Sequence, residues 1–346
     1  MKPIKVGIAG LGRSGWGIHA NAFGHLPEIY EVVAVCDPDK TRQEEAIDKF
    51  DCLAYSDYAE LIADNAVELV VVATPSHLHA SDAVTAMRAG KHVMVEKPMA
   101  SDLAGVDEMI AVAKETGQIL TINQNRRYSA DFAKVQEVIA SGVLGEILEV
   151  RINVGGFSRR WDWQTLKEFG GGALNNTGAH FVDMGLLLLD DPEPTVFCHM
   201  VATPLYAGDA DSHVKVILKP APGKGPLVEV NITHACAYPQ DIWLVLGTQG
   251  SMKCSGKEAQ WKYYDPNEVE PLVLDTKPTP DRSYNRELLP WIEERAEIVN
   301  DGAGHVQDLY RSVFASIRDG APLVVTPESV RNQIVVMEKC RLQSPV

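Results

Sequence analysis

The stretch IKVGIAGLGRSG, residues 4–15, decides the fold, because a G-x-G-x-x-G motif directly follows a run of apolar residues. The run predicts a buried strand, and a helix is expected from about Ser14. Gly10 permits the tight turn, Gly12 lets the backbone approach a pyrophosphate, and Gly15 lets the helix pack closely on the strand. Unpaired amides at the start of the helix favour phosphate binding. The sequence thus predicts a dinucleotide site with contacts from Gly10, Gly12, Arg13, Ser14 and Gly15.

A carboxylate at the end of the second expected strand completes this motif. Asp37 follows the strand expected at residues 31–36 and lies 22 residues beyond Gly15, close to the spacing of about 20 that the motif requires. Asp37 would accept hydrogen bonds from the adenosine ribose hydroxyls and repel a 2′-phosphate, which favours NAD. Arg42, with Lys40 near it, could instead pair with that phosphate. NAD is therefore the expected cofactor, with NADP as the alternative.

The rest of the first third alternates strand-like and helix-like segments. Buried strands separated by helices indicate a parallel sheet with right-handed crossovers. We therefore expect a doubly wound Rossmann domain over residues 1–124, in which Thr41 and Glu44 form a capping box at the start of one helix. Further strands are expected at residues 69–73, 92–95 and 119–123, and further helices at 79–89 and 103–114.

The pattern changes after about Asn125, where strands follow one another without long helices between them. Such a pattern indicates a large, mainly antiparallel sheet. One apolar face of that sheet would be left uncovered by helices, so we expect a homodimer or homotetramer to bury it. Residues 125–346 are thus expected to form an α+β domain for substrate binding and oligomerisation. Its strands are expected at residues 146–154, 195–202, 213–218, 228–234 and 242–247, and its helices at 172–189, 306–319 and 326–341.

The composition limits the possible partners. The chain of 346 residues has a formal net charge of −15, which argues against nucleic acids and anionic membranes. No apolar stretch approaches the roughly 20 residues of a membrane span, and the start lacks the apolar region of a signal peptide. The six cysteines include no C-x-x-C pair and are expected to be free thiols in a reducing, cytoplasmic compartment. His77 and His79 cannot share a helical face, so no metal site is expected.

Longer motifs resemble those of one protein family. The runs ATPSHLH (residues 73–79), AGKHVMVEKP (89–98) and GGGALNNTGAH (170–180) are similar to motifs of the Gfo/Idh/MocA family, which includes glucose–fructose oxidoreductase and inositol dehydrogenase. The resemblance covers most of the chain and is weakest between about residues 209 and 295. It implies an NAD(P)-dependent oxidoreductase that acts on a secondary alcohol of a sugar, cyclitol or related polyol.

The resemblance also implies roles for single residues. Lys97 would reach the substrate hydroxyl and stabilise the developing alkoxide, and the Lys97–Pro98 bond would be cis. His180 would be the general base, with Asp183 three residues later on the same helical face. Asn176 stands where the family usually has Asp, so His180 should be a weaker base here, although Asn176 can still orient a sugar hydroxyl. Cofactor contacts would also come from Thr74, Pro75, His79, Glu96, Lys97 and Arg127.

Two alternatives concern the substrate side and the overall function. Trp161 and Trp163 could form an aromatic wall against a sugar ring, or they could pack in the core or in an interface. The site could also serve a glycosidase or lyase that recycles its NAD without net redox change, or a cofactor-sensing regulator without activity. The presence of both Lys97 and His180 argues against the regulator.

Overall fold

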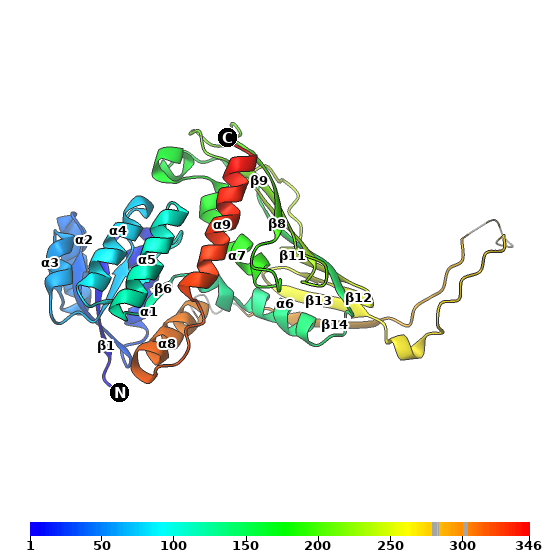
Figure 1. Ribbon diagram of the computed structural model, residues 1–346, viewed down its shortest axis with the longest axis horizontal. Coiled ribbons are helices and arrows are strands. Elements are labelled where there is room, and N and C mark those ends of the chain that lie inside the picture. The colour runs from blue at the N-terminus through cyan, green and yellow to red at the C-terminus, as the bar shows by residue number, and fades with distance from the viewer. Residues whose placement is uncertain (279–281, 283, 300–303) are drawn as a thin grey trace.

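A computed structural model describes residues 1–278, 282, 284–299 and 304–346 (Figure 1). The N-terminal part is a six-stranded parallel sheet in the order β3-β2-β1-β4-β5-β6, which confirms the doubly wound sheet. All four residues of the central strand β4 are buried, as expected where helices cover both faces of a sheet. The strands are β1 (Ile4–Ala9), β2 (Tyr30–Cys36), β3 (Leu53–Tyr55), β4 (Leu69–Val72), β5 (His92–Val95) and β6 (Leu120–Ile122).

One helix of this part begins differently from the prediction. The N-cap of α2 is Asp39, whose carboxylate accepts a hydrogen bond from the Thr41 amide at 2.9 Å. The capping box at Thr41 is therefore wrong, because Asp39 lies further upstream and its carboxylate already satisfies an exposed amide. The helical segments are η1 (Gly15–Ala20, a π-helix), α1 (Asn21–Gly24), α2 (Lys40–Phe50), α3 (Tyr58–Ala63), η2 (Ser76–Leu78), α4 (His79–Arg88) and α5 (Leu103–Thr116).

The second sheet has eight strands in the order β14-β13-β12-β11-β7-β10-β9-β8. Neighbouring strands are antiparallel except β7 and β10, which are parallel. Buried and more exposed residues alternate along β8, β9 and β10, so one face packs against helices and the other lies open. This confirms the mainly antiparallel, open-faced sheet. Its strands are β7 (Ile147–Gly155), β8 (Thr195–Val201), β9 (His213–Lys219), β10 (Leu227–Thr233), β11 (Trp243–Gly247), β12 (Gly250–Cys254), β13 (Glu258–Tyr263) and β14 (Ile292–Glu297).

The last two helices join the two sheets, and α9 lies between them in Figure 1. The Tyr30 hydroxyl donates to the carbonyl of Tyr310 in α8 at 2.7 Å. Arg318 of α8 donates to both carboxylate oxygens of Glu68 at 2.9 Å. Helix α8, near the C-terminus, therefore packs against the N-terminal parallel sheet. The helical segments of this part are η3 (Asn125–Tyr128), α6 (Ala130–Ala140), η4 (Trp163–Thr165), η5 (Lys167–Phe169), η6 (Leu174–Gly178, a π-helix), α7 (Ala179–Leu186), η7 (Pro266–Glu268), α8 (Gly304–Asp319) and α9 (Pro327–Gln343).

Candidate active site

The glycine loop lies between β1 and β4, where the strand order of the parallel sheet reverses and where such sheets bind ligands. Gly10 has a φ of +88°, and a Cβ on it would lie 2.5 Å from the Ala73 carbonyl oxygen. A Cβ on Gly15 would lie 1.7 Å from the Gly10 oxygen, so neither position accepts a side chain. A Cβ on Gly12 would meet nothing within 4 Å. The backbone at Gly12 is therefore open to a phosphate, and the loop fits the pyrophosphate of NAD.

The Asp37 carboxylate is engaged by the backbone around it. Its Oδ2 accepts a hydrogen bond from the Leu11 amide at 2.7 Å, and its Oδ1 accepts one from the Asp39 amide at 2.9 Å. Arg42 Nη1 lies 3.4 Å from Oδ2, and the Arg42 side chain is about half exposed. Asp37 therefore ties the end of β2 to the glycine loop, with an exposed guanidinium beside it.

Lys97 connects the two parts of the chain. It follows β5, and the Lys97–Pro98 peptide bond is cis. The Lys97 ammonium donates to the Asn176 carbonyl oxygen at 2.9 Å and to Asn176 Oδ1 at 3.4 Å. Asn176 belongs to the π-helix η6, which leads directly into α7. The structure thus brings two of the three expected catalytic residues into contact, and α7 carries the third, His180.

The surroundings of Lys97 lower the pKa of its ammonium group. Burial lowers the pKa of the ammonium, and the negative charge of Glu96 counteracts this effect. The positive charges of Arg13 and Arg126 lower the pKa of Lys97 further. Arg126 is exposed, and its guanidinium carbon lies 5.5 Å from the centre of the Phe181 ring.

A buried chain of hydrogen bonds supports Lys97. Glu96 Oε2 accepts the Lys97 amide at 3.1 Å, while Oε1 accepts from His19 Nε2 at 2.9 Å and from Asn123 Nδ2 at 2.6 Å. Burial alone would raise the pKa of Glu96, but the hydrogen bond and charge of His19, with Asn123 and Lys97, lower it to about 2. The Tyr310 hydroxyl contacts the other ring nitrogen of His19. Both oxygens of Glu96, which the resemblance places among the cofactor contacts, are therefore already held by the protein.

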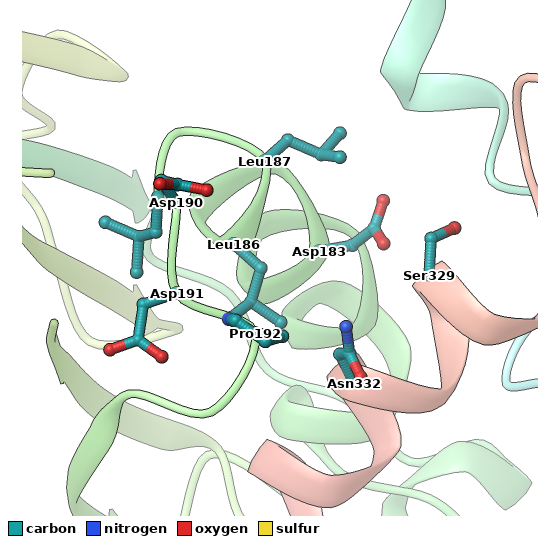
Figure 2. Close-up of a pocket in the computed structure, with 9 residues that line it drawn as sticks. Asp183, Leu186, Leu187, Asp190, Asp191, Pro192, Ser329 and Asn332 are labelled. Carbon is teal, nitrogen blue, oxygen red and sulfur yellow. The ribbon is translucent and has the colours of Figure 1, made fainter. Parts of the chain in front are cut away.

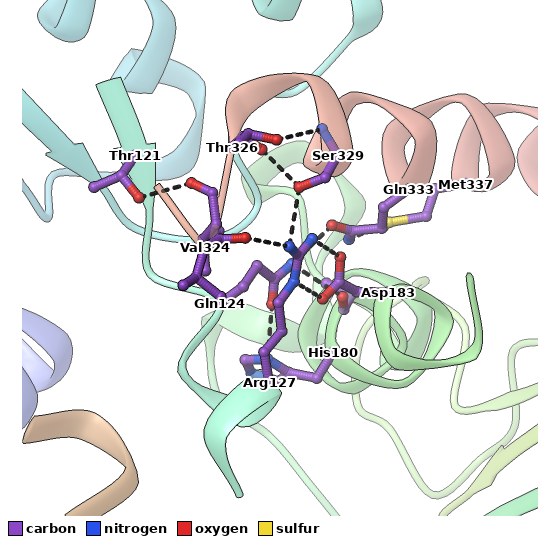
Figure 3. Close-up of polar contacts among 12 residues, drawn as sticks. Thr121, Gln124, Arg127, His180, Asp183, Val324, Thr326, Ser329, Gln333 and Met337 are labelled. Atoms are coloured by element: carbon purple, nitrogen blue, oxygen red, sulfur yellow. Dashed lines mark hydrogen bonds and ion pairs between the residues drawn. The ribbon is translucent and has the colours of Figure 1, made fainter. Parts of the chain in front are cut away.

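Gln124 determines the orientation of His180 (Figure 3). The Gln124 amide nitrogen donates to the Ala179 carbonyl at 3.2 Å and to Gln333 Oε1 at 2.7 Å. Gln124 Oε1 is therefore an acceptor, and it receives a hydrogen bond from His180 Nδ1 at 3.2 Å. With the proton on Nδ1, a neutral imidazole has its lone pair on Nε2. Sequence reasoning missed Gln124, although its position just after β6, at the carboxyl edge of the sheet, marks it as a candidate.

Arg127 and Asp183 form a buried ion pair in the same view (Figure 3). Arg127 Nε and Nη2 donate to the two carboxylate oxygens at 2.7 and 2.6 Å, and Nη1 donates to Ser329 Oγ at 2.9 Å. Burial raises the pKa of Asp183, and Arg127 opposes that rise. The two side chains link the segment after β6 with α7 and α9. Arg127 thus lies in the interface between these segments, and Asp183, on the same helix as His180, is engaged by Arg127.

His79 is buried, at 1% exposure, beneath the turn that carries Thr74 and Pro75. Its two ring nitrogens lie 2.7 Å from the Pro98 carbonyl oxygen and 2.9 Å from the Thr74 carbonyl oxygen. The Thr74 hydroxyl donates to Asp82 Oδ2 at 2.7 Å. His79 therefore joins this turn to the cis-proline loop, and it supports the candidate cofactor contacts instead of offering a nitrogen of its own.

The two tryptophans before the glycine-rich turn lie at the surface. Trp161 is 82% exposed and Trp163 is 55% exposed, so the core packing that the sequence left open is excluded. The Asp162 carboxylate between them accepts from the Gln164 amide at 3.0 Å and from Arg160 at 2.9 and 3.0 Å. An aromatic wall for a sugar ring and an interface are both consistent with these positions.

A separate pocket lies between the end of α7 and α9 (Figure 2). Leucine side chains from α7 and the segment after it line much of the pocket, together with Ser329 and Asn332. Its one buried carboxylate, Asp183, is already paired with Arg127. The pocket is therefore not the site formed around Lys97.

The ranges that the structure describes hold neither a candidate metal cluster nor a membrane-spanning helix. No group of three His, Cys, Asp or Glu side chains there could hold a metal ion. No helix in the same ranges is long and apolar enough to span a membrane. The six cysteines are all free.

Fold and site together define a two-domain oxidoreductase whose N-terminal domain binds NAD. Two family models match the chain: an oxidoreductase family with an NAD-binding Rossmann fold over residues 4–124, and the GFO/IDH/MocA C-terminal domain over residues 132–253. The chain therefore belongs to the Gfo/Idh/MocA family of oxidoreductases.

Similar proteins include dehydrogenases of inositols. The scyllo-inositol 2-dehydrogenase (NADP(+)) IolW of Bacillus subtilis is 27% identical over 97% of this chain and 92% of its own length. The inositol 2-dehydrogenase of Salmonella typhimurium is 30% identical over 69% of this chain and 70% of its own length. The structure of the oxidoreductase yvaA from Bacillus subtilis is similar in fold, with a TM-score of 0.82, 22% identity, and coverage of 99% of this chain and 96% of that one.

Proposed function

We propose that this protein transfers a hydride between a secondary alcohol of a sugar, cyclitol or related polyol and a nicotinamide. The observation that carries the proposal is the contact between Lys97 and Asn176, 2.9 Å from ammonium to carbonyl oxygen, one turn before His180. An acid–base pair is thereby assembled from both domains, at the carboxyl edge of the parallel sheet. The inositol dehydrogenases among its relatives support the same substrate class.

Each residue has a defined task in this reaction. In the oxidative direction, His180 Nε2 takes the hydroxyl proton of the substrate, and the Lys97 ammonium stabilises the developing negative charge on that oxygen. The carbon–hydrogen bond breaks with its electron pair, so the alcohol becomes a ketone. Bound nicotinamide supplies the hydride acceptor or donor. Asn176 holds Lys97 in place and presents its amide to a second hydroxyl of the substrate.

We propose NAD as the physiological cofactor, bound by residues 1–124, with the substrate held by residues 125–346. The Asp37 carboxylate at the end of β2 supports NAD because it would repel a 2′-phosphate. The exposed Arg42 guanidinium, 3.4 Å from Asp37, is what would permit NADP. A comparison of kcat/KM with NAD and with NADP decides between the two cofactors. If Asp37 sets the preference for NAD, Asp37→Ala should bring the two values of kcat/KM closer together.

The test of the proposed reaction is nicotinamide absorbance during turnover of a panel of sugars, cyclitols and polyols with each cofactor. Wild type should reduce the nicotinamide with at least one of them. Lys97→Ala should abolish this activity, whereas Lys114→Ala, which removes an exposed lysine paired with Glu328, should retain it. Substrate cleavage without any absorbance change would instead favour a glycosidase or lyase that recycles its NAD. Cofactor binding without any turnover would favour a cofactor-sensing regulator.

We also propose that the chain works as a homodimer or homotetramer. Residues 264–278 and 284–291, between β13 and β14, extend away from the second sheet (Figure 1), and Leu272, Leu274 and Leu288 among them are almost fully exposed. Such apolar exposure is unfavourable for an isolated chain in water. Sedimentation analysis should give a dimer or tetramer, and the double change Leu272→Asp and Leu274→Asp should lower the mass. A monomeric wild type would contradict this proposal.

A further inference from the structure

Two adjacent arginines after β6 have opposite surroundings. Arg127 is buried in its ion pair with Asp183, whereas Arg126 is exposed. The guanidinium of Arg126 lies against the Phe181 ring, 5.5 Å from its centre, and Phe181 directly follows His180. A guanidinium on an aromatic face is oriented by that face and keeps its donors for another partner. Arg126 is thus a positioned cation beside the proposed catalytic base.

The carboxylates nearest to the proposed catalytic residues along the chain are already engaged. Glu96 accepts hydrogen bonds from His19, Asn123 and the Lys97 amide. Asp183 is held by Arg127, with both oxygens used. At position 176, where the family resemblance implies a carboxylate, the chain has a neutral amide.

The site therefore has an excess of positive charge within an acidic protein. The chain as a whole has a net charge of −15, yet Lys97, Arg126 and Arg13 come close enough that each arginine lowers the pKa of the lysine. The ammonium of Lys97 donates to the carbonyl and amide oxygens of Asn176, which carry no net charge. Arg13, in the glycine loop, is placed to serve the phosphates of the cofactor. Arg126 instead follows β6 and lies against Phe181 of α7.

We propose that the substrate is anionic, a sugar acid or polyol acid whose carboxylate pairs with Arg126 while its reacting hydroxyl lies at Lys97 and His180. This inference rests on the proposed dehydrogenase function. The planar guanidinium can bind a carboxylate through two parallel hydrogen bonds, a geometry that a single hydroxyl cannot match. The neutral Asn176 would then avoid the repulsion that an aspartate would exert on the incoming acid. Arg126 thereby sets specificity without taking part in hydride transfer.

The test compares acids with their neutral counterparts: D-glucuronate with D-glucose, D-galacturonate with D-galactose, and D-gluconate with D-glucitol. For at least one pair, the wild-type kcat/KM for the acid should exceed that for the neutral member by about tenfold or more. Arg126→Gln should lower kcat/KM for the acid by about 10- to 100-fold, mainly through KM, and the neutral member should lose less. Arg126→Lys should keep part of the preference. Arg88→Gln, which removes an exposed arginine on α4, is the matched control and should change kcat/KM neither for the acid nor for its neutral counterpart.

The outcomes separate this inference from the function on which it rests. A preference for the neutral members, or an acid-to-neutral ratio unchanged in Arg126→Gln, would overturn it while the dehydrogenase function stands. Weaker NADH binding in Arg126→Gln, matching the loss in kcat/KM, would also overturn it, because Arg126 would then serve the cofactor. If no member of any pair is oxidised, calorimetry on the NADH-loaded protein decides: an acid that binds more tightly than its neutral counterpart, and loses this advantage in Arg126→Gln, supports the inference. Equal binding within every pair overturns it. The proposed function itself fails only if the wider panel of sugars, cyclitols and polyols also gives no turnover.

Discussion

At the scale of single residues, amides hold the proposed acid–base pair in place. Asn176 accepts the hydrogen bonds of the Lys97 ammonium, and Gln124 accepts that of His180 Nδ1. An amide orients its partner without adding charge, so the pKa of Lys97 is governed by burial and by the charges of Glu96, Arg13 and Arg126. Reintroducing a charge, or removing an acceptor, should therefore change the reaction in a defined direction.

Asn176→Asp places a carboxylate beside the Lys97 ammonium. Burial lowers the pKa of Lys97, and a nearby negative charge favours the charged form and raises that pKa. Because the charged form stabilises the alkoxide, kcat/KM should fall as pH rises through the Lys97 pKa. Asn176→Asp should move this alkaline limb to higher pH, and it should also make His180 a stronger base. If the alkaline limb of the kcat/KM profile stays at the same pH in Asn176→Asp, the role of Lys97 is contradicted. Asn267→Asp, at an exposed position, serves as the control.

Gln124→Leu removes the acceptor for the Nδ1 proton of His180. The ring should then sample the wrong tautomer and orientation, and kcat should fall by about 10- to 100-fold, a partial loss of general-base catalysis. Steady-state kinetics and NADH fluorescence titration together check this, because the Kd for cofactor should not follow kcat. Gln136→Leu, on the exposed face of α6, is the matched control. An unchanged kcat in Gln124→Leu would show that His180 needs no positioning.

Motifs and hydrogen-bond geometry contribute different parts of the site. Lys97, Asn176 and His180 lie in motifs at residues 89–98 and 170–180, so they can be predicted from the sequence alone. Arg126 and Arg127 are identical neighbours, and only the turn of η3 decides which is buried and which is exposed. Gln124, likewise, acquires its role through contacts with α7 and α9, which are 55 and 209 residues away along the chain. Contacts across such distances have no local signal in the sequence.

At the scale of elements, a buried hydrogen-bond chain joins η1, β5 and α8. His19 of η1 lies between Glu96, at the end of β5, and Tyr310 of α8. Burial raises the pKa of Tyr310 well above its usual value, so its hydroxyl keeps its proton and serves as a donor. These hydrogen bonds hold η1, the helix that follows the glycine loop, against the segment that carries Lys97.

Glu96→Gln should make stability less sensitive to acid. The pKa of Glu96 is about 2 in the folded protein and 4.5 ordinarily, so the unfolded chain takes up this proton first as pH falls. The stabilisation is fully present above about pH 4.5 and is lost as pH falls toward about 2, and it amounts to about 3 kcal/mol. Urea unfolding from about pH 7 to about pH 3 should therefore show a shallower acid-side loss in Glu96→Gln than in wild type. The same slope in both, with Glu28→Gln as an exposed control, would show that Glu96 does not titrate in this way.

Elements with apolar runs or clear alternation can be predicted, and those without cannot. The strands β1, β4 and β5 are short apolar runs bounded by turns, and all of them match. By contrast, β14 reads Ile-Glu-Glu-Arg-Ala-Glu and is exposed along nearly its whole length, so it carries no periodic signal. The helix α6 is not among the predicted elements, although its sequence carries a helical pattern: its buried residues Phe132, Val135 and Val138 follow helical spacing.

At the scale of the whole molecule, the C-terminal helices hold the two sheets together. The order of the domains, with a parallel sheet first and a mainly antiparallel sheet second, follows from the sequence. The return of α8 and α9 to the first sheet does not, because it depends on ion pairs such as Arg318–Glu68 and Arg331–Asp107 between distant positions. The parallel pairing of β7 with β10 within an otherwise antiparallel sheet is also a property of the folded chain.

Arg127→Ala should destabilise the protein far more than Arg126→Ala. Loss of Arg127 leaves the buried Asp183 carboxylate without its partner, which typically costs about 3–5 kcal/mol. Arg126 is exposed and forms no ion pair with any residue that the structure describes, so its loss should change stability by no more than about 0.5 kcal/mol. Chemical unfolding of the two variants measures the difference. Similar stabilities would contradict the assignment of Arg127 to the interface between the domains.

The most direct test of the proposed reaction follows a single hydrogen atom. A sugar, cyclitol or polyol that supports turnover is prepared with deuterium on its carbon atoms and incubated with the enzyme and NAD, and the nicotinamide and the sugar product are both analysed by mass spectrometry. The account predicts one deuterium in the reduced nicotinamide for each ketone formed, and no such transfer with Lys97→Ala. Cleaved or rearranged sugar with no accumulation of labelled, reduced nicotinamide would contradict it.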